Sequence, residues 1–336
     1  MREMVRSHDE KQRQRKALLG EVREGVHGSF DGQKIVAVGQ SLYYAPANAW
    51  RTFADFLMDY IKHVMTAEWG NAEIAKPFEE RHPVMKWYDG MCRFQQKQER
   101  APDGVFYSAP NGAMNAYVLL AYDLYVLDHH SSLQSVVVKR LKDKNQFQGA
   151  RHELFVAATC ISAGFDIEYE DERDGTHTHP EFVAKHRTTG ETYSVEATSR
   201  HRAQGNLGKR VEPKLRLERL IAHGIRKESP HPRVVFVGLI VPPQDVPLCH
   251  ERWRARLSRA VEHTRHKDSA RNPFELIVFS RHNYGHDEPD GPAPAADTLA
   301  RFGRPWPNLQ AVPAGLMALY EAAAKYGHVP QTFEES

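Results

Sequence analysis

The chain has 336 residues, of which 41% are hydrophobic and 10% aromatic, which predicts a globular protein of one large or two modest domains. No apolar run approaches the roughly 18 residues of a membrane span, and the charged N-terminus lacks the apolar segment of a signal peptide. The formal net charge of +2 is close to neutral, so any strongly basic surface must be local. Three cysteines without zinc-like or disulfide-like spacing favour a reducing, cytoplasmic compartment.

A mostly helical region is predicted for residues 1–144. An apolar run at residues 34–44 predicts a strand or hairpin arm, and Asn48 is a suitable N-cap for a helix with aromatic residues at helical spacing. Breaks rich in proline and glycine separate the further helices, expected near residues 83–97, 113–127 and 132–142. Such a region can recognise substrate, contact a partner protein or a second copy of the chain, or brace the domain that follows, and the pattern does not choose among these roles.

The second region, residues 145–336, begins with a predicted helix. Apolar residues cover a broad face of residues 146–163, and Gly164 is placed to end the helix. Glu153 lies in the middle of this helix and is a candidate site residue. The alternative is a surface glutamate paired with Arg151 or with a neighbouring turn. Residues 165–170 then alternate apolar and acidic side chains, which predicts a strand.

Two further predicted strands flank a hairpin turn at residues 188–190. In an antiparallel pair, Glu181 on the first strand lies near Glu196 and Thr198, which share one face of the second. Two converging carboxylates repel each other unless a cation sits between them, and Mg²⁺ prefers oxygen ligands. The alternative is that both glutamates are solvated residues on an exposed sheet face.

Basic residues are dense between residues 199 and 227, with few acids among them. From Val211 onward the apolar residues recur at helical spacing, so we expect a helix with one buried face and a basic outer side. Cations beside a carboxylate site suit a phosphate backbone, which makes nucleic acid the predicted partner. The alternative is an ordinary solvated helix face. The residues predicted to bind nucleic acid are Arg200, Arg202, Lys209, Arg210 and Lys214.

Near-continuous apolar runs at residues 233–241 and 274–280 predict buried strands of a sheet that is covered on both faces. The helix expected between them, residues 247–266, adds a second basic surface. Residues 282–297 are rich in proline, glycine and aspartate and predict a loop, and a last helix is expected at residues 313–326. The region is therefore predicted to be α/β, with a mixed central sheet flanked by helices.

The element order and two short motifs resemble the PD-(D/E)XK nuclease superfamily. The motifs are Pro180-Glu181 at the start of the second strand and Glu196-Ala197-Thr198 in the third. This resemblance implies a restriction-endonuclease-like fold and hydrolysis of phosphodiester bonds in nucleic acid, in DNA rather than RNA. It also implies that Glu181, Glu196 and the backbone carbonyl of Ala197 hold Mg²⁺, for which Mn²⁺ can substitute, and that Glu153 assists. A role in bacterial defence is associated with such nucleases.

One position departs from the family signature. Thr198 stands where the signature has a lysine, which in such enzymes positions the attacking water or stabilises charge in the transition state. Arg200, on the same face of the same strand, is the first candidate to replace it, and Lys185, Lys209 and Lys214 are others. The second interpretation is a catalytically inactive nuclease-like protein that binds nucleic acid or scaffolds a complex. Both interpretations remain open at this stage.

Overall fold

The described part of the chain forms two compact units. The computed structural model describes residues 25–46, 49–105, 107–131, 133–169, 181–199, 216–226, 229–239, 248–264, 273–281 and 297–333, together with Glu10 and Arg13. The first unit holds the described residues up to Leu154 and those from Gly327 onward, and the second holds those from Phe155 to Tyr326. The chain passes from one unit to the other within helix α7 (Phe147–Ser162), whereas the sequence places the boundary before this helix, between residues 144 and 145.

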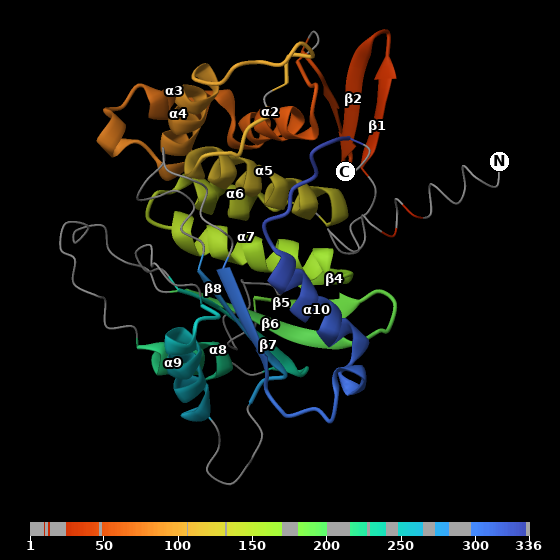
Figure 1. Cartoon of the computed structure of the whole chain (residues 1–336), viewed down its shortest axis with the longest axis vertical. Coiled ribbons are helices and arrows are strands. Elements are labelled where there is room, and N and C mark those ends of the chain that lie inside the picture. The colour runs from red at the N-terminus through yellow and green to blue at the C-terminus, as the bar shows by residue number, and fades with distance from the viewer. Residues whose placement is uncertain are drawn as a thin grey trace. The chain divides into compact units, whose positions relative to one another are not determined.

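The first unit combines helices with a small antiparallel sheet (Figure 1). The sheet consists of β1 (Val26–Phe30), β2 (Gln33–Val38) and β3 (Ser41–Tyr44), so the predicted strand at residues 34–44 forms two strands of a three-stranded sheet. The helices are α2 (Phe53–Met65), α3 (Ala67–Ile74), α4 (Pro83–Gln96), α5 (Gly112–His130) and α6 (Ser135–Lys142).

Helix α2 begins later than the sequence indicates. Asn48 lies outside the described residues, and Thr52 is the N-cap in its place. The Thr52 hydroxyl accepts the N–H of Asp55 at 3.2 Å, and the Asp55 carboxylate accepts the N–H of Thr52 at 2.8 Å. This reciprocal capping box satisfies two N–H groups that an uncapped helix would leave without partners, which fixes the start of α2 at Phe53.

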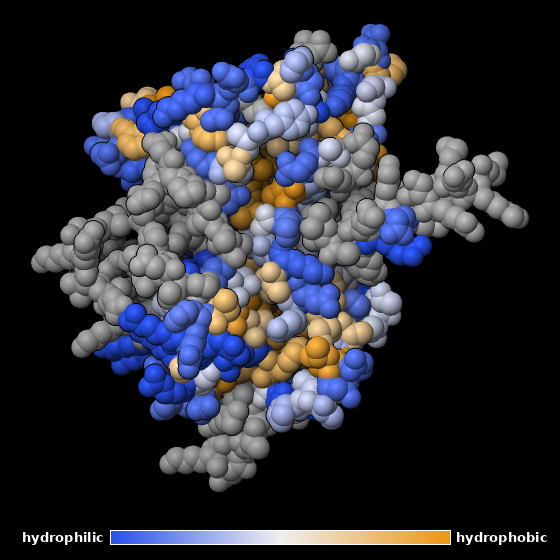
Figure 2. Space-filling view, viewed as in Figure 1, coloured by the Kyte–Doolittle hydropathy of each residue, from blue (hydrophilic) through white to orange (hydrophobic). Residues whose placement is uncertain are grey.

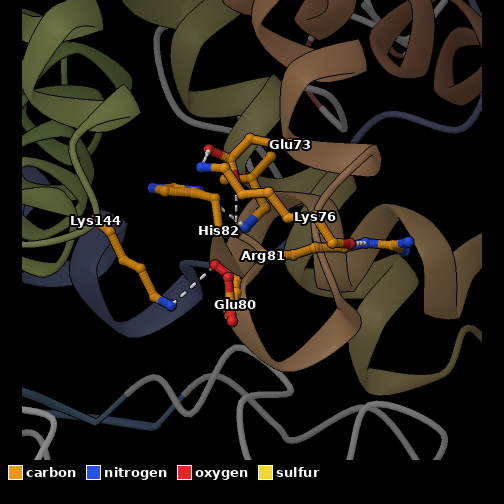
Figure 3. Close-up of polar contacts among 7 residues, drawn as sticks. Glu73, Lys76, Glu80, Arg81, His82 and Lys144 are labelled. Atoms are coloured by element: carbon orange, nitrogen blue, oxygen red, sulfur yellow. Dashed lines mark hydrogen bonds and ion pairs between the residues drawn. The ribbon is translucent and has the colours of Figure 1, made fainter.

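A buried carboxylate joins the end of α3 to the residue that precedes α4 (Figure 3). Glu73 in α3 is 8% exposed and accepts the backbone N–H of His82 at 2.8 Å and the Lys76 ammonium at 2.5 Å. Burial alone would raise the pKa of Glu73, but the hydrogen bonds from Lys76 and His82 outweigh burial and lower it. The Lys144 ammonium donates to the carbonyl of Glu80 at 3.2 Å, so the segment after α6 is held as well.

The second unit is built on a six-stranded mixed sheet. Strands β4, β5 and β6 are antiparallel neighbours, β6, β7 and β8 are parallel, and β9 is antiparallel to β8. Their bounds, in sheet order, are β4 (Phe165–Tyr169), β5 (Phe182–His186), β6 (Thr192–Ser199), β7 (Arg233–Gly238), β8 (Leu276–Arg281) and β9 (Asp297–Phe302). The helices are the second half of α7, α8 (Leu217–Arg226), α9 (Glu251–Glu262) and α10 (Ala314–Lys325).

Helices cover the sheet on both sides (Figure 1). Helices α8 and α9 share one apolar core with Val235 and Val237 of β7 and with Ile277 and Phe279 of β8. Because alternate residues of a strand share a face, this side, named the α8 face, also carries Val183 and Lys185 of β5, Ser194, Glu196 and Thr198 of β6, and Arg233 of β7. On the opposite face, Phe155 of α7 contacts Phe236 with ring centroids 5.9 Å apart, and Tyr320 of α10 stacks on Phe302.

Helix α10 is attached to the sheet at both ends. Its N-cap, Pro313, makes no side-chain capping bond, and the Glu191 carboxylate from the β5–β6 turn accepts the N–H of Gly315 at 3.1 Å. Burial alone would raise the pKa of Glu191, but the hydrogen bonds from Gly315 and the Tyr193 hydroxyl outweigh burial and lower it. Near the other end, the Thr298 hydroxyl donates to the carbonyl of Ala323 at 2.9 Å. A distant carboxylate thus supplies the cap that the local sequence lacks.

The predicted mixed α/β architecture is confirmed, with one strand missing from the prediction. Residues 282–296 of the predicted loop lie outside the described residues, but Asp297 is the first residue of β9. Its carboxylate pairs with Arg281 at the end of β8 and accepts the N–H of Leu248 at 3.0 Å, which fixes the start of the strand. In the described part of the chain, no helix has both the length and the apolar composition to cross a bilayer.

Candidate carboxylate site

Glu196 is a buried acid in the middle of the sheet. It lies on β6 and is 2% exposed, and its neighbours on the α8 face, Ser194 and Thr198, are 0% and 6% exposed. Burying a carboxylate costs free energy unless a cation or hydrogen bonds compensate its charge. The alternative of a solvated glutamate on an exposed sheet face is therefore wrong for Glu196.

Helix α8 covers this part of the sheet at very close range. A methyl group placed on Gly224 would lie 2.9 Å from Cγ1 of Val235, 3.6 Å from Cγ2 of Thr198 and 3.9 Å from Cβ of Glu196. A glycine at this point of the helix lets the backbone approach β6 and β7 more closely than any other residue would. The close approach of α8 is what removes Glu196 and Thr198 from solvent.

Arg233 is the basic residue that the sheet brings to Glu196. It is the first residue of β7 and is paired in register with Ser194, two residues before Glu196 on the parallel neighbour β6. The two side chains therefore share the α8 face. Burial lowers the pKa of the Arg233 guanidinium, and the negative charge of Glu196 opposes that effect. Sequence reasoning missed Arg233, because only the pairing of β6 with β7 places it beside Glu196.

Glu181 lies beside β6 at the start of β5. It immediately precedes β5, is half-buried, and donates its backbone N–H to the carbonyl of Val195 at 3.1 Å. Phe182, the next residue, is paired in register with Val195, so Glu181 is adjacent to the segment of β6 that carries Glu196. The two glutamates predicted to converge are thus on adjacent segments of one sheet.

The other predicted residues of β6 have distinct surroundings. Ala197 is half-buried, and its side chain lies on the face opposite to Glu196 because the strand alternates. Thr198 is buried under α8 and offers a hydroxyl in place of an ammonium. Lys185 is exposed and is paired with Thr192, the first residue of β6, so it lies at the far end of the strand pair from Glu196.

Glu153 forms an ion pair within the first unit. Both of its carboxylate oxygens accept hydrogen bonds from the guanidinium of Arg140, at 2.5 and 2.6 Å. This partner, Arg140 of α6, differs from the predicted Arg151, which pairs with the buried Asp123 at 2.6 Å. The bidentate pair is sufficient to account for Glu153 structurally. Its assisting role in the site stays a prediction.

The residues predicted to bind nucleic acid lie outside the described residues. They are Arg200, Arg202, Lys209, Arg210 and Lys214, and the role of Arg200 as a replacement for the missing lysine lies there with them.

The donor set can be compared with the needs of a metal ion. Among the residues that the structure describes, no group of three or more His, Cys, Asp or Glu side chains is arranged to hold a metal. Glu181 and Glu196 offer two carboxylates, and Mg²⁺ is often held by one or two carboxylates with water completing its coordination. The chemistry of the pair fits Mg²⁺ or Mn²⁺, and the metal site remains a prediction.

Comparison with known proteins adds no relative. No family model matches the sequence, and neither the curated proteins nor the solved structures contain a significant match.

Proposed function

We propose that the second unit is a metal-dependent nuclease of the restriction-endonuclease-like type, which hydrolyses phosphodiester bonds in DNA in preference to RNA. The proposal is carried by the buried Glu196 on a central strand, with Glu181 on the adjacent segment. The element order α7–β4–β5–β6–α8–β7 supports it, because the same order underlies the resemblance to PD-(D/E)XK nucleases.

Each residue has a definite task in this proposal. Glu181 and Glu196 hold the divalent ion, and the backbone carbonyl of Ala197 is a further oxygen ligand. When bound, the ion stabilises charge on the phosphate and activates water. Helix α8 keeps water away from Glu196 on one side, and Arg233 compensates the charge of the carboxylate. The described residues place no lysine beside Glu196, so Arg200 is the leading candidate for the missing cation.

A second candidate function is a noncatalytic nuclease-like protein that binds nucleic acid or scaffolds a complex. Two observations favour it. Thr198 carries no charge, and Arg233 places a positive charge on the same face of the sheet as Glu196. Loss of one preorganised cation lowers the rate of the catalysed reaction roughly a hundredfold to a thousandfold, which would make cleavage by a slow enzyme undetectable.

The test is cleavage of plasmid and single-stranded DNA with Mg²⁺ or Mn²⁺. We expect metal-dependent cutting by the wild type, and a loss of at least about a hundredfold in Glu196→Ala. Glu168→Ala is the matched control, because Glu168 is an exposed acid on the α8 face of the neighbouring β4. Equal cutting by all three proteins would place the chemistry elsewhere.

Substitution of Thr198 separates the two candidate functions. If the wild type is silent and Thr198→Lys cuts, the scaffold is intact and the lysine alone is missing. Thr198→Val is the control, since it removes the hydroxyl and keeps the shape. Because Thr198 is buried against α8, thermal unfolding of each variant must accompany the assay. Silence of the wild type and of Thr198→Lys, with both folded, would overturn the nuclease proposal.

A further inference from the structure

We propose that the outer surface of α8 and α9 binds the sugar–phosphate backbone of nucleic acid. The inference rests on the proposed function, since it takes nucleic acid as the partner of the second unit. It assigns the contact to a particular pair of helices, which lie on the α8 face of the sheet (Figure 1).

Helix α8 separates an apolar side from a basic side. Leu217, Ile221 and Gly224 are buried against the sheet. The exposed residues at spacings of three and four are Arg216, just before the helix, Arg219, His223 and Arg226. Residues at these spacings lie along one stripe of a helix. The basic stripe is therefore on the side of α8 that points away from Glu196.

Helix α9 lies beside α8 and also carries exposed arginines. Trp253, Leu257 and Ala260 are buried in the core that both helices share, and the helices contact each other. Arg252, Arg254 and Arg259 are exposed, and Figure 2 shows mainly hydrophilic residues over α9. Arg252 and Arg259, seven residues apart, lie on one side of α9, and Arg254 lies on the other flank of its buried side. Together with the stripe of α8, these arginines form one basic layer of the unit.

The layer formed by α8 and α9 is more positively charged than the rest of the chain. Arg216, α8 and α9 together contain seven arginines and three glutamates, whereas the whole chain has a net charge of only +2. Within the described residues, no ion pair with an acid joins Arg219, Arg226, Arg254 or Arg259. An anionic partner would relieve the mutual repulsion of these charges.

Like charges also interact between Arg254 of α9 and Arg301 of β9. Burial lowers the pKa of Arg301, and the nearby Arg254 lowers it further, while Glu262 opposes the shift in part. Arg301 is paired in register with Ile277 of β8, so it lies on the α8 face of the sheet, at the margin of the layer. Such an arrangement costs folding free energy, and binding of phosphate groups would offset that cost.

The side chains favour nucleic acid over a membrane surface. All Lys/Arg positions in the described parts of α8 and α9 are arginines, whose planar guanidinium binds phosphate oxygens in a bidentate manner. A helix that lies on a membrane inserts large apolar side chains beside its basic residues. Among the described residues, no exposed large hydrophobic side chain belongs to α8 or α9.

The topology also indicates where the basic first turn of α8 lies along the sheet. Strands β6 and β7 are parallel, so the chain must return from the end of β6 to the start of β7. Helix α8 lies in this connection, and we therefore expect it to run in the direction opposite to both strands. The first turn of α8, with Arg216 and Arg219, therefore lies toward the ends of β6 and β7, and Gly224 lies at the level of Glu196 and Thr198. A nucleic-acid backbone held by this turn would lie near the ends of β6 and β7, with α8 between it and Glu196.

The experiment measures affinity for a duplex oligonucleotide by fluorescence anisotropy, over a range of salt concentrations and in EDTA so that no cleavage occurs. Three double variants are compared with the wild type: Arg219→Gln with Arg226→Gln in α8, Arg254→Gln with Arg259→Gln in α9, and Lys97→Gln with Lys139→Gln as the control. The control removes two exposed cations from the first unit.

We expect each arginine pair to weaken binding roughly tenfold and to lower the slope of log K against log salt by about 1.8, since each phosphate contact contributes about 0.9. The control should change neither quantity. Unchanged affinity and slope in both arginine variants, with binding by the wild type, would overturn the inference and leave the proposed function standing.

Other outcomes are equally decisive. A wild type that binds anionic phospholipid vesicles and no oligonucleotide would overturn the inference and the nucleic-acid partner together. Binding that depends on the arginines, in a protein that never cleaves with Mg²⁺ or Mn²⁺, would support the inference and favour the noncatalytic candidate function. Cleavage by a wild type whose arginine variants bind normally would refute only the assignment to α8 and α9.

Discussion

The α8 face of the six-stranded sheet has a covered half and an open half. Over β6 and β7, α8 approaches closely enough to bury Glu196 and Thr198. Over β4 and β5, Asp166, Glu168 and Lys185 of the same face are exposed. An exposed acid is well hydrated and needs no explanation, whereas a buried one must be compensated. Acidic residues occur in strands of both halves, so their presence alone does not indicate a functional site. Burial distinguishes Glu196 from the exposed acids and makes it the candidate functional residue.

The largest effect on stability is expected from removing the cation of the covered half. Arg233→Met removes a positive charge that interacts with the buried Glu196, and we expect a loss of about 1–3 kcal/mol in the free energy of unfolding, below the full cost of breaking a buried pair because Arg233 is only partly buried. Lys185→Met, on the open half, should change the free energy of unfolding by less than about 0.5 kcal/mol. Urea unfolding followed by circular dichroism measures both.

A double variant sharpens this result. Glu196→Gln combined with Arg233→Met should cost less than the sum of the two single changes, because both changes break one interaction. If the losses of unfolding free energy in the two single variants simply add, the charges of Glu196 and Arg233 do not stabilise each other. The covered half would then differ from the open half only in packing.

The next effect concerns the closeness of α8 to the sheet. Gly224→Ala places a methyl group 2.9 Å from Val235, so the helix must shift, and we expect a loss of about 1–2 kcal/mol. Gly70→Ala is the matched control, because a methyl group there meets no atom within 4 Å and a helical alanine is favoured by about 0.5–1 kcal/mol. Thermal unfolding should therefore move in opposite directions for the two variants. A stabilised Gly224→Ala would show that α8 is not held as closely as described.

The smallest effect is expected at Glu191, on the margin of the sheet. Its pKa is lowered in the folded protein, so its contribution to stability is present above the usual pKa of glutamate and is lost as the pH falls through the folded-state pKa. Because Glu191 is partly exposed, Glu191→Gln should cost at most about 1 kcal/mol at pH 7. Unfolding at several pH values should show the variant and the wild type converge toward acid. A constant difference would mean that the charge of Glu191 is irrelevant.

Local patterns predicted most of the second unit. Alternation identified β4, β5 and β6, apolar runs identified β7 and β8, and Gly164, with a φ of 86°, ends α7 as expected. Strand β9 was missed because its residues are half-buried and follow a segment rich in proline and glycine. In the first unit, Thr52 caps α2 because its hydroxyl forms a reciprocal pair with Asp55, whereas the sequence pattern indicated Asn48.

The candidate site was predictable only in part. Glu181 and Glu196 were identified because a hairpin pairs nearby segments, and local turn geometry sets that register. Arg233 was not, since β6 and β7 are joined by a long connection and their parallel pairing leaves no local pattern. The burial of Glu196 likewise depends on Gly224 of α8, a residue that helix periodicity alone does not mark as a contact point.

The contact between Glu191 and Gly315 has a consequence for the order of events during synthesis. The two residues are separated by 124 positions, so translation delivers the acceptor long before the donor. Until that loop closes, the first turn of α10 has only water to satisfy its N–H groups, and closing a long loop is entropically costly. Contacts of this kind form late in folding. Helix α10 is therefore expected to join the sheet among the last steps, after the β5–β6 hairpin has formed.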